Sequence, residues 1–218
     1  DLARNMFPGV VKYVSYLDWV ARDSTVSGLV SFVEFGDWLS PRPSKIVDEM
    51  SSAFNHAQAI RIVRDTAIAL DEDNHAVAQR YYTAYANAQR GFHTAYFRNG
   101  TYGNGEQAAL VYALYLGSMP TKALSEVVLA QLLDSIQSDP ACRPCLLTGI
   151  LSTKWLMETL SLYGRTDVAL SLALKTERPS WGHMMVMNAT TISESWGSVD
   201  ELPPLRTSRS HPALASIG

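Results

Sequence analysis

The chain has 218 residues, of which 47% are hydrophobic and 18% charged, and its formal net charge is −3 at pH 7. This length suits one domain or a large piece of one, and the composition excludes extensive disorder because enough apolar side chains are present to build a sizeable core. The lysines and arginines are scattered and form no basic patch for nucleic acid. No apolar run approaches the roughly 18 to 20 residues that span a bilayer. We therefore expect neither nucleic acid nor a membrane as a partner.

Helical periodicity dominates the first half of the chain. The segment VVKYVSYLDWVAR places four apolar residues on one stripe of a helix: Val10, Val14, Leu17 and Ala21. Two long helical segments follow, from Pro43 to about Leu70 and from about Glu72 to Phe97, with a polar break between them at Asp71 to Asn74.

The second half repeats one pattern of helix ends and starts. The helix in GEQAALVYALYLG ends at Gly117, and Thr121 is placed to cap the next helix. LSTKWLMETLSLYG ends in the same way at Gly164, and Thr166 is placed to cap DVALSLALKT. Runs of β-branched residues do not alternate with these helices as a parallel sheet would require. The sequence therefore predicts an all-α fold.

The links between helices are short, which favours antiparallel hairpins packed as a bundle, a solenoid or a toroid. A solenoid would show a fixed repeat period, and we find none. Longer loops rich in glycine, proline and aromatic residues lie between the helices, and loops of that size in a compact domain are often functional.

The two cysteines, Cys142 and Cys145, form the motif CRPC, which is compatible with a redox pair or with half of a zinc site. A zinc site needs about four ligands, and the sequence has no second CxxC or nearby histidine pair. A redox motif would also be expected within a βαβ pattern. The motif is therefore interpreted as a turn with two small, semi-buried side chains. We predict no metal and no cofactor, and the cellular compartment is left undetermined.

The segment ATTISESW contains a carboxylate with an unusual set of neighbours. Glu194 lies between two serines, with Thr190 and Thr191 before it and Trp196 after it. Hydroxyl groups such as those of Thr190, Thr191 and Ser193 can donate hydrogen bonds to a carboxylate and favour its charged form. By this chemistry alone, Glu194 is either a surface loop residue or a catalytic acid or base.

Five segments occur together and in a fixed order. They are FGDWLSP (35–41), NGTYGNGEQAALVYALYLG (99–117), LLTGILSTKWLMETLSLYGRTDVAL (146–170), RPSWGHMMVMNATTISESW (178–196) and SHPALASIG (210–218). Together they closely resemble the catalytic domain of the family 78 α-L-rhamnosidases, which are inverting glycoside hydrolases. The resemblance covers nearly the whole chain. It implies an (α/α)6 toroid of antiparallel helical hairpins, of which residues 1–218 would form a part that is incomplete at both ends.

The resemblance also implies the site residues. Glu194 stands at the position of the general base that deprotonates the attacking water. Asp37 and Trp38 of GDW, Trp181 of PSW and His211 near the end of the barrel match residues of the rhamnose pocket. The general acid of such enzymes lies in an Asp-Glu-Arg segment upstream of these motifs, and this sequence contains no such segment. The implied substrate is a rhamnose-containing glycoside or oligosaccharide.

Physical chemistry supports this division of roles. Inverting hydrolysis needs an acid and a base roughly 6.5 to 9.5 Å apart. The indoles of Trp38, Trp181 and Trp196 offer apolar faces for a deoxy sugar, while Asp37 and His211 can hydrogen-bond its hydroxyls.

Each of these residues also has a structural interpretation. Asp37 can cap the turn before Pro41, the tryptophans can be core residues, and His211 can bind the backbone of the tail. Tyr102 and Glu106 either reach the pocket or open the following helix.

Four positions depart from the family pattern: Ser193, Ser195, Cys145 and Ser210, where the family commonly has Trp, Arg, His and Asn. These changes alter the expected walls of the sugar site rather than the fold. One alternative is another hairpin-built sugar hydrolase, such as an unsaturated glucuronyl hydrolase or a trehalase-like enzyme, although the paired ATTxxE and GDW motifs argue against it. The other is a non-catalytic sugar-binding or scaffold remnant, which the missing acid and the substitutions favour.

Overall fold

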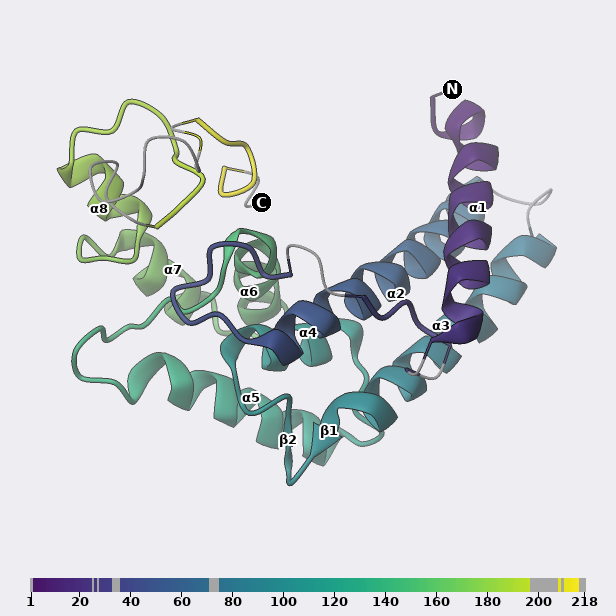
Figure 1. Ribbon diagram of the computed structural model, residues 1–218, viewed down its shortest axis with the longest axis horizontal. Coiled ribbons are helices and arrows are strands. Elements are labelled where there is room, and N and C mark those ends of the chain that lie inside the picture. The colour runs from purple at the N-terminus through teal and green to yellow at the C-terminus, as the bar shows by residue number, and fades with distance from the viewer. Residues whose placement is uncertain are drawn as a thin grey trace.

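The computed structural model describes residues 2–24, 26, 28–32, 36–70, 75–196, 208 and 210–215, and this part of the chain is mostly helical (Figure 1). Its helices are α1 (Leu2–Val20), α2 (Lys45–Ala69), α3 (His75–Tyr96), α4 (Gln107–Leu116), α5 (Lys122–Gln137), α6 (Ile150–Leu162), α7 (Thr166–Leu174) and α8 (Trp181–Val186), with a 3-10 turn at Ala21–Asp23. Two short strands, β1 (Phe97–Arg98) and β2 (Thr101–Tyr102), pair antiparallel. The predicted all-α fold class is confirmed.

The helices follow an arc that runs from α1 on the right of Figure 1, through α4 and α5, to α8 at the upper left. Helices that follow each other in the chain pack together, as in α1 with α2, α2 with α3, α4 with α5, α6 with α7, and α7 with α8. The fold is therefore the predicted stack of helical hairpins, consistent with a toroid.

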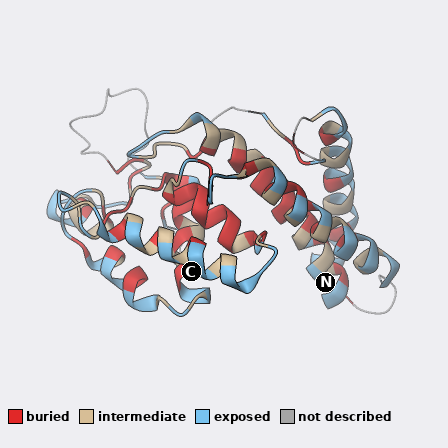
Figure 2. Cartoon of the chain, turned by 90° about the horizontal axis from the view of Figure 1, so that it is seen from below, coloured by how far each residue is buried: buried red, intermediate tan, exposed pale blue. Residues whose placement is uncertain are grey.

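Helix α4 forms the centre of the core. Its sequence QAALVYALYL contains no charged residue, and every residue except Tyr115 is buried. A helix that is apolar all round must be covered on all sides, and α4 contacts α2, α5 and α6. Figure 2 shows buried residues concentrated in the middle of the molecule and exposed residues on the outer turns.

Several predicted helix ends are confirmed. Gly117 follows α4 in the left-handed conformation, with φ 63° and ψ 40°, which glycine adopts without a steric penalty. Gly164 follows α6 with φ 70°. The Thr121 side chain accepts a hydrogen bond from the Leu124 amide at 3.2 Å and so caps α5.

The predicted cap at Thr166 is wrong by one residue. Helix α7 begins at Thr166 itself, because the carbonyl of Arg165 already accepts hydrogen bonds from the amides of Val168 and Ala169. The Arg165 guanidinium contacts both carboxylate oxygens of Asp167 at 3.0 Å. Asp167 is thereby held in the first turn, where a negative charge interacts favourably with the helix dipole.

The long helices lie where periodicity placed them. Helix α1 starts eight residues before the predicted stripe, of which Val14 and Ala21 are buried while Val10 and Leu17 are half-buried. The predicted polar break at Asp71 to Asn74 lies outside the described residues. Among the helices that the structure describes, none is both long and apolar enough to cross a membrane.

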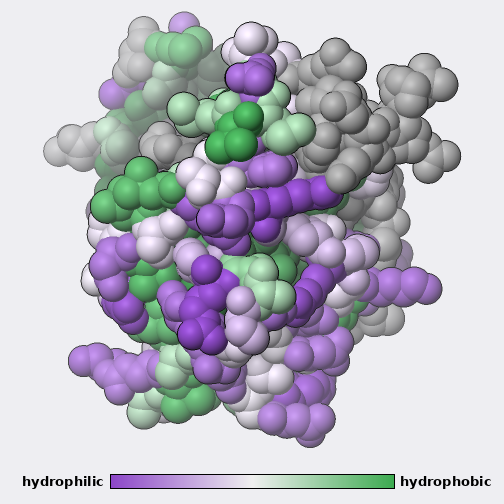
Figure 3. Space-filling view, turned by 90° about the vertical axis from the view of Figure 1, so that its left-hand side faces the viewer, coloured by the Kyte–Doolittle hydropathy of each residue, from purple (hydrophilic) through white to green (hydrophobic). Residues whose placement is uncertain are grey.

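Large apolar side chains are exposed at both ends of the arc, as predicted. Those on α1 are Leu2, Met6, Tyr13, Tyr16 and Trp19, and those on α7 and around α8 are Leu170, Leu174, Met185, Val186 and Met187. Figure 3 views the α8 end, where hydrophobic side chains reach the surface between hydrophilic ones. Burial of these faces in a complete barrel stays a prediction.

The N-terminus of α6 is pressed against the loop that precedes α2. The Ile150 amide donates to the carbonyl of Trp38 at 2.9 Å. A Cβ atom built on Gly149 would lie 2.4 Å from the carbonyl oxygens of both Asp37 and Trp38. Only glycine permits this approach of two backbones.

We predict that Gly149→Ala destabilises the complete protein. The new methyl group at position 149 meets rigid backbone, and overpacking of this kind costs about 1–3 kcal/mol. Urea unfolding followed by circular dichroism measures the change. A midpoint equal to that of the wild type would contradict the close packing at Gly149.

Candidate active site

Two other segments of the chain hold the carboxylate of Glu194. The Trp38 indole nitrogen, from the loop before α2, donates to Oε1 of Glu194 at 2.9 Å. The backbone amide of Ser208 donates to Oε2 at 2.6 Å, and the Glu194 amide donates back to the Ser208 carbonyl at 2.9 Å. Each carboxylate oxygen thus accepts one of these hydrogen bonds and has a second lone pair with which to accept another.

This environment favours the ionised carboxylate. The pKa of Glu194 is lowered, chiefly by the hydrogen bond from the Ser208 amide, with further lowering by the Trp38 indole and the charge of His211. Partial desolvation acts in the opposite direction. The carboxylate is therefore charged at neutral pH, as a general base must be before it accepts a proton.

The donors to Glu194 differ from those suggested by its sequence neighbours. Hydroxyls of Thr190, Thr191 and Ser193 were the predicted donors, yet the carboxylate is bound by Trp38 and Ser208. The reason is geometric, since the fold brings the Trp38 loop and the Ser208 backbone against the carboxylate. Ser208 acts through its backbone amide, and no side-chain pattern could have identified it.

Asp37 anchors the loop that carries Trp38. Its buried carboxylate accepts hydrogen bonds from the Gly149 amide at 2.7 Å, the Ser152 amide at 3.0 Å and the Ser152 hydroxyl at 2.6 Å. Burial raises the pKa of Asp37, and these three donors oppose that rise. The side chain therefore satisfies the free amides at the start of α6. A hydrogen bond from Asp37 to a sugar stays a prediction.

The tryptophans divide into buried and accessible ones. Trp196 is only 3% exposed and donates to the carbonyl of Thr148 at 2.9 Å, so the expectation that it offers a face to a sugar is wrong. Its ring meets that of Trp181 edge to face, with centroids 4.9 Å apart. Trp181 begins α8, is half-buried and donates to the carbonyl of Leu214 at 3.0 Å. Trp38 is also half-buried.

His211 lies beside the Glu194 segment. Its backbone amide donates to the carbonyl of Ile192 at 2.9 Å, and its Nδ1 accepts from the Ala213 amide at 3.2 Å. In the neutral ring the proton is then on Nε2, which can donate to a ligand. The alternative role of His211, binding to the backbone of the tail, is thus present. It does not use Nε2.

The structure brings Trp38, Glu194 and His211 together directly. Trp181 joins the same segment through Trp196, whereas the side chain of Asp37 points to the start of α6. On the other side of this loop, a cavity of about 250 Å³ is bordered by residues that include Gly36, His56 and Leu151.

Tyr102 and Glu106 take the structural role that was one of their two predicted alternatives. The Tyr102 hydroxyl is buried 2.8 Å from Nδ1 of His93. Glu106 precedes α4 and accepts from the Ser44 hydroxyl at 2.6 Å and the Asn104 amide at 2.7 Å. Both residues therefore stabilise the start of α4 and the hairpin before it.

The CRPC motif forms a disulfide between Cys142 and Cys145. The predicted turn is present, with Cys142 half-buried and Cys145 buried, and the disulfide joins the two side chains. Asp139 lies close enough to the two sulfurs for the three residues to hold a metal ion in principle. Metal binding by cysteine uses thiolates, and the disulfide has none.

The helical hairpins and the ionised, positioned carboxylate beside indole and imidazole groups are features of an all-α glycoside hydrolase domain. The chain belongs to the family described as the bacterial α-L-rhamnosidase six-hairpin glycosidase domain, whose model matches residues 1–218.

Relatives of known name agree with this assignment. The chain is 30% identical over 215 residues to an α-L-rhamnosidase of Alteromonas sp. (strain LOR), a match that covers 90% of this chain and 22% of the relative. It is similar to the structure of α-L-rhamnosidase from Dictyoglumus thermophilum, with a TM-score of 0.85, 26% identity, and coverage of 98% of this chain and 24% of that one. It is also similar to the Streptomyces avermitilis α-L-rhamnosidase solved in complex with L-rhamnose, with a TM-score of 0.84, 25% identity, and coverage of 99% and 20%. The chain thus spans about a fifth to a quarter of the length of these relatives.

We predict that Trp38→Phe raises the pKa of Glu194. The variant keeps an aromatic ring but removes the N–H that binds Oε1 and favours the charged form. NMR titration of the side-chain carboxyl carbon in the complete protein should show an inflection at higher pH than in the wild type.

Trp155→Phe is the matched control for this change. Trp155 packs in α6 against the rings of Phe54 and Tyr115, so the same substitution there should leave the Glu194 inflection in place. An unchanged inflection in Trp38→Phe would show that the indole hydrogen bond does not influence the carboxylate.

Proposed function

We propose that this chain forms part of the catalytic domain of an α-L-rhamnosidase that hydrolyses terminal α-L-rhamnose from glycosides or oligosaccharides with inversion. The observation that carries this proposal is the Glu194 carboxylate, which Trp38 and Ser208 hold in its charged form near His211. Membership of the rhamnosidase six-hairpin family supports the reaction. A similar protein solved in complex with L-rhamnose supports the substrate.

Glu194 would act as the general base. One lone pair on each oxygen binds a fixed donor, so the carboxylate keeps its orientation while another lone pair accepts a proton from water. The water would attack the anomeric carbon from the face opposite the leaving group. A second carboxylic acid must protonate the leaving oxygen, and the resemblance assigns it to an Asp-Glu-Arg segment that other parts of a complete enzyme would supply.

Recognition of the sugar would use the half-buried aromatic rings and the imidazole. Trp38 and Trp181 have apolar faces that suit the methyl and C–H groups of a deoxy sugar. Nε2 of His211 can donate to a sugar hydroxyl. Asp37 would contribute mainly by fixing the position of Trp38, with any direct contact to a hydroxyl as an additional role.

The chain would be one section of an (α/α)6 barrel, with residues 1–218 belonging to a single catalytic domain. The exposed apolar side chains of α1 and of the α7–α8 region would then pack against further helices of the complete enzyme. We expect no cofactor, nucleic acid or membrane to take part in the reaction.

Glu194→Gln in the complete enzyme should lower kcat by about 10² to 10⁴ because it removes the base while keeping the shape of the side chain. Binding of L-rhamnose, measured by calorimetry, should change little. An aryl α-L-rhamnoside with a good leaving group needs little acid assistance, so its hydrolysis should still depend on Glu194.

The 218 residues alone should hydrolyse natural rhamnosides negligibly.

Glu126→Gln is the control for this experiment. Glu126 is exposed on α5 and pairs only loosely with Lys122, so the same change of carboxylate to amide should leave kcat unaltered. Wild-type kcat for Glu194→Gln would reject the general-base role. Binding of rhamnose by a complete protein that hydrolyses neither substrate would instead favour the non-catalytic sugar-binding alternative.

A further inference from the structure

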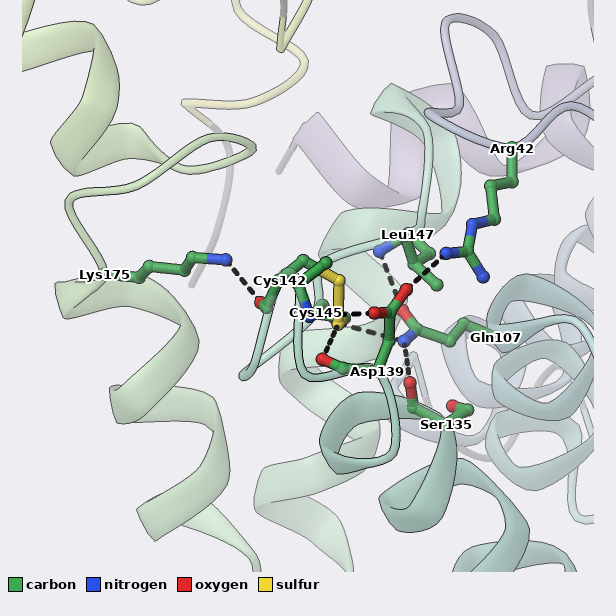
Figure 4. A network of polar contacts seen from close by, with 9 residues as sticks. Arg42, Gln107, Ser135, Asp139, Cys142, Cys145, Leu147 and Lys175 are labelled. Atoms are coloured by element: carbon green, nitrogen blue, oxygen red, sulfur yellow. Dashed lines mark hydrogen bonds and ion pairs between the residues drawn. A yellow bond between two sulfur atoms is a disulfide. The ribbon is translucent and has the colours of Figure 1, made fainter.

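The Cys142–Cys145 disulfide lies in the connection between α5 and α6, at a place where one sulfur is accessible and the other is not. Cys142 is half-buried, and Cys145 is fully buried. Figure 4 shows the disulfide in a network of polar side chains. A thiolate that approaches from solvent can therefore reach the sulfur of Cys142 first.

Charged groups of both signs lie near this disulfide. A carboxylate oxygen of Asp139 is within 4.8 Å of both sulfurs, and Arg42 pairs with that carboxylate at 2.7 Å. Two further cations lie in or against the loop. The Lys175 amine donates to the carbonyls of Cys142 and Pro144, at 2.5 and 3.0 Å, and points to the loop in Figure 4. Arg143 lies within the CRPC motif itself and is exposed. Positive charge near a cysteine stabilises the thiolate and promotes thiol–disulfide exchange.

A prepared hydrogen-bond acceptor exists for the reduced form. The sulfur of Cys145 lies 3.6 Å from the carbonyl oxygen of Asp139. Once reduced, the Cys145 thiol can donate to this oxygen, so the buried sulfur is not left without a polar contact. The side chain of Asp139 is itself held by Arg42 at 2.7 Å.

The side chain of Gln107 forms hydrogen bonds with the segment that follows the disulfide. Its amide nitrogen donates to the carbonyl of Cys145 at 2.9 Å, and its amide oxygen accepts from the Leu147 amide at 2.9 Å. Gln107 is buried, so its amide oxygen depends on the position of this segment, whereas its amide nitrogen also donates to the carbonyl of Ser135 at 3.2 Å. Displacement of Cys145 would break this pair of hydrogen bonds.

Residues 147 and 148 of the same segment also contact the candidate active site. The Ser40 hydroxyl donates to the carbonyl of Leu147 at 3.0 Å, and the Trp196 indole donates to the carbonyl of Thr148. Ser40 lies two residues after Trp38, and Trp196 lies two residues after Glu194. Hydrogen bonds joined by short stretches of backbone therefore connect the disulfide with both sides of the site.

We propose that Cys142 and Cys145 form a thiol–disulfide exchange site, reduced by a dithiol, whose redox state sets the order of residues 145–149 and, through them, the candidate active site. A thiolate of the dithiol attacks the sulfur of Cys142, the Cys142–Cys145 bond breaks, and Cys145 leaves as a thiolate that takes up a proton. The second thiol of the dithiol then displaces Cys142 from the mixed disulfide. Two electrons and two protons pass to the protein, and the dithiol becomes a disulfide.

Reduction removes the covalent link that fixes the CRPC turn. Residues 145–149 are then held by hydrogen bonds alone, so opening of this segment becomes more frequent. Because Trp196 and the loop of Trp38 bind the same segment, the carboxylate of Glu194 loses part of its positioning. The effect on hydrolysis, unlike the exchange itself, rests on the proposed rhamnosidase function.

The test uses the complete enzyme, purified without reductant and then incubated with dithiothreitol under native conditions. After native treatment the protein is quenched with acid, denatured and alkylated, so that the label reports reduction rather than accessibility. Peptide mass spectrometry should find no label on Cys142 and Cys145 without dithiothreitol and label on both after it. Hydrogen–deuterium exchange should become faster in peptides that cover residues 36–44, 145–149 and 192–196. Turnover of an aryl α-L-rhamnoside should fall by about 2- to 30-fold, the usual range for coupling through such networks, and recover on reoxidation.

A double variant, Cys142→Ser with Cys145→Ser, should show the turnover and exchange rates of the reduced enzyme whether or not dithiothreitol is present. Reduction that occurs only when dithiothreitol is added together with a denaturant would overturn the proposal, because the disulfide would then be purely structural. Labelling without any change in hydrogen exchange in the three peptides would also overturn it. Absence of rhamnoside hydrolysis in both redox states would count against the proposed function alone, since labelling and hydrogen exchange do not depend on activity.

Discussion

The buried carboxylate of Asp37 is the contact on which the rest of the site depends. It accepts three hydrogen bonds from Gly149 and Ser152 at the start of α6. Hydrogen bonds to a charged, buried acceptor are strong, and removal of one partner leaves polar groups without compensation. Because the adjacent carbonyl of Trp38 binds α6 as well, the indole is fixed in the position from which it reaches Glu194. A residue expected to touch the sugar thus serves first to join two helical hairpins.

The setting of Glu194 balances two demands of the general-base role proposed for it. Hydrogen bonds from Ser208 and Trp38 keep the carboxylate ionised and oriented, but the same bonds lower its pKa and so weaken it as a base. In return, these hydrogen bonds orient the carboxylate, and a base must be oriented toward the water that it deprotonates. Ser193 and Ser195 flank this carboxylate where the family commonly has Trp and Arg, and both are buried. The carboxylate therefore relies on contacts from distant segments rather than on its neighbours in sequence.

Residues 138–149 lie between the core and the candidate site and contact both. This segment follows α5, contains the disulfide, binds the buried side chain of Gln107 from the central helix, and ends at Gly149 under the loop of Asp37. It also receives the indole of Trp196, which is why that ring is buried and cannot face a ligand. This segment thus contacts the loop of Trp38 and the ring of Trp196, although none of its residues forms a described hydrogen bond with Glu194.

The sequence by itself determined the helices, most of their ends and the family, because apolar periodicity, Gly117 and Thr121 are local signals and because five ordered motifs are specific in combination. It also identified Glu194, Trp38 and His211 as a group that the structure brings together. The side-chain partners were decided only by the tertiary structure. The hydrogen bond from the Ser208 backbone, the capping role of Asp37 and the burial of Trp196 all depend on which distant segments meet, and local patterns carry no information about such meetings. The bond between Cys142 and Cys145 is local in sequence, and the conformation of the CRPC turn decided it. The start of α7 at Thr166 was also decided by hydrogen bonds to the carbonyl of Arg165. Every residue has such a carbonyl, so the residue type at position 165 does not reveal it.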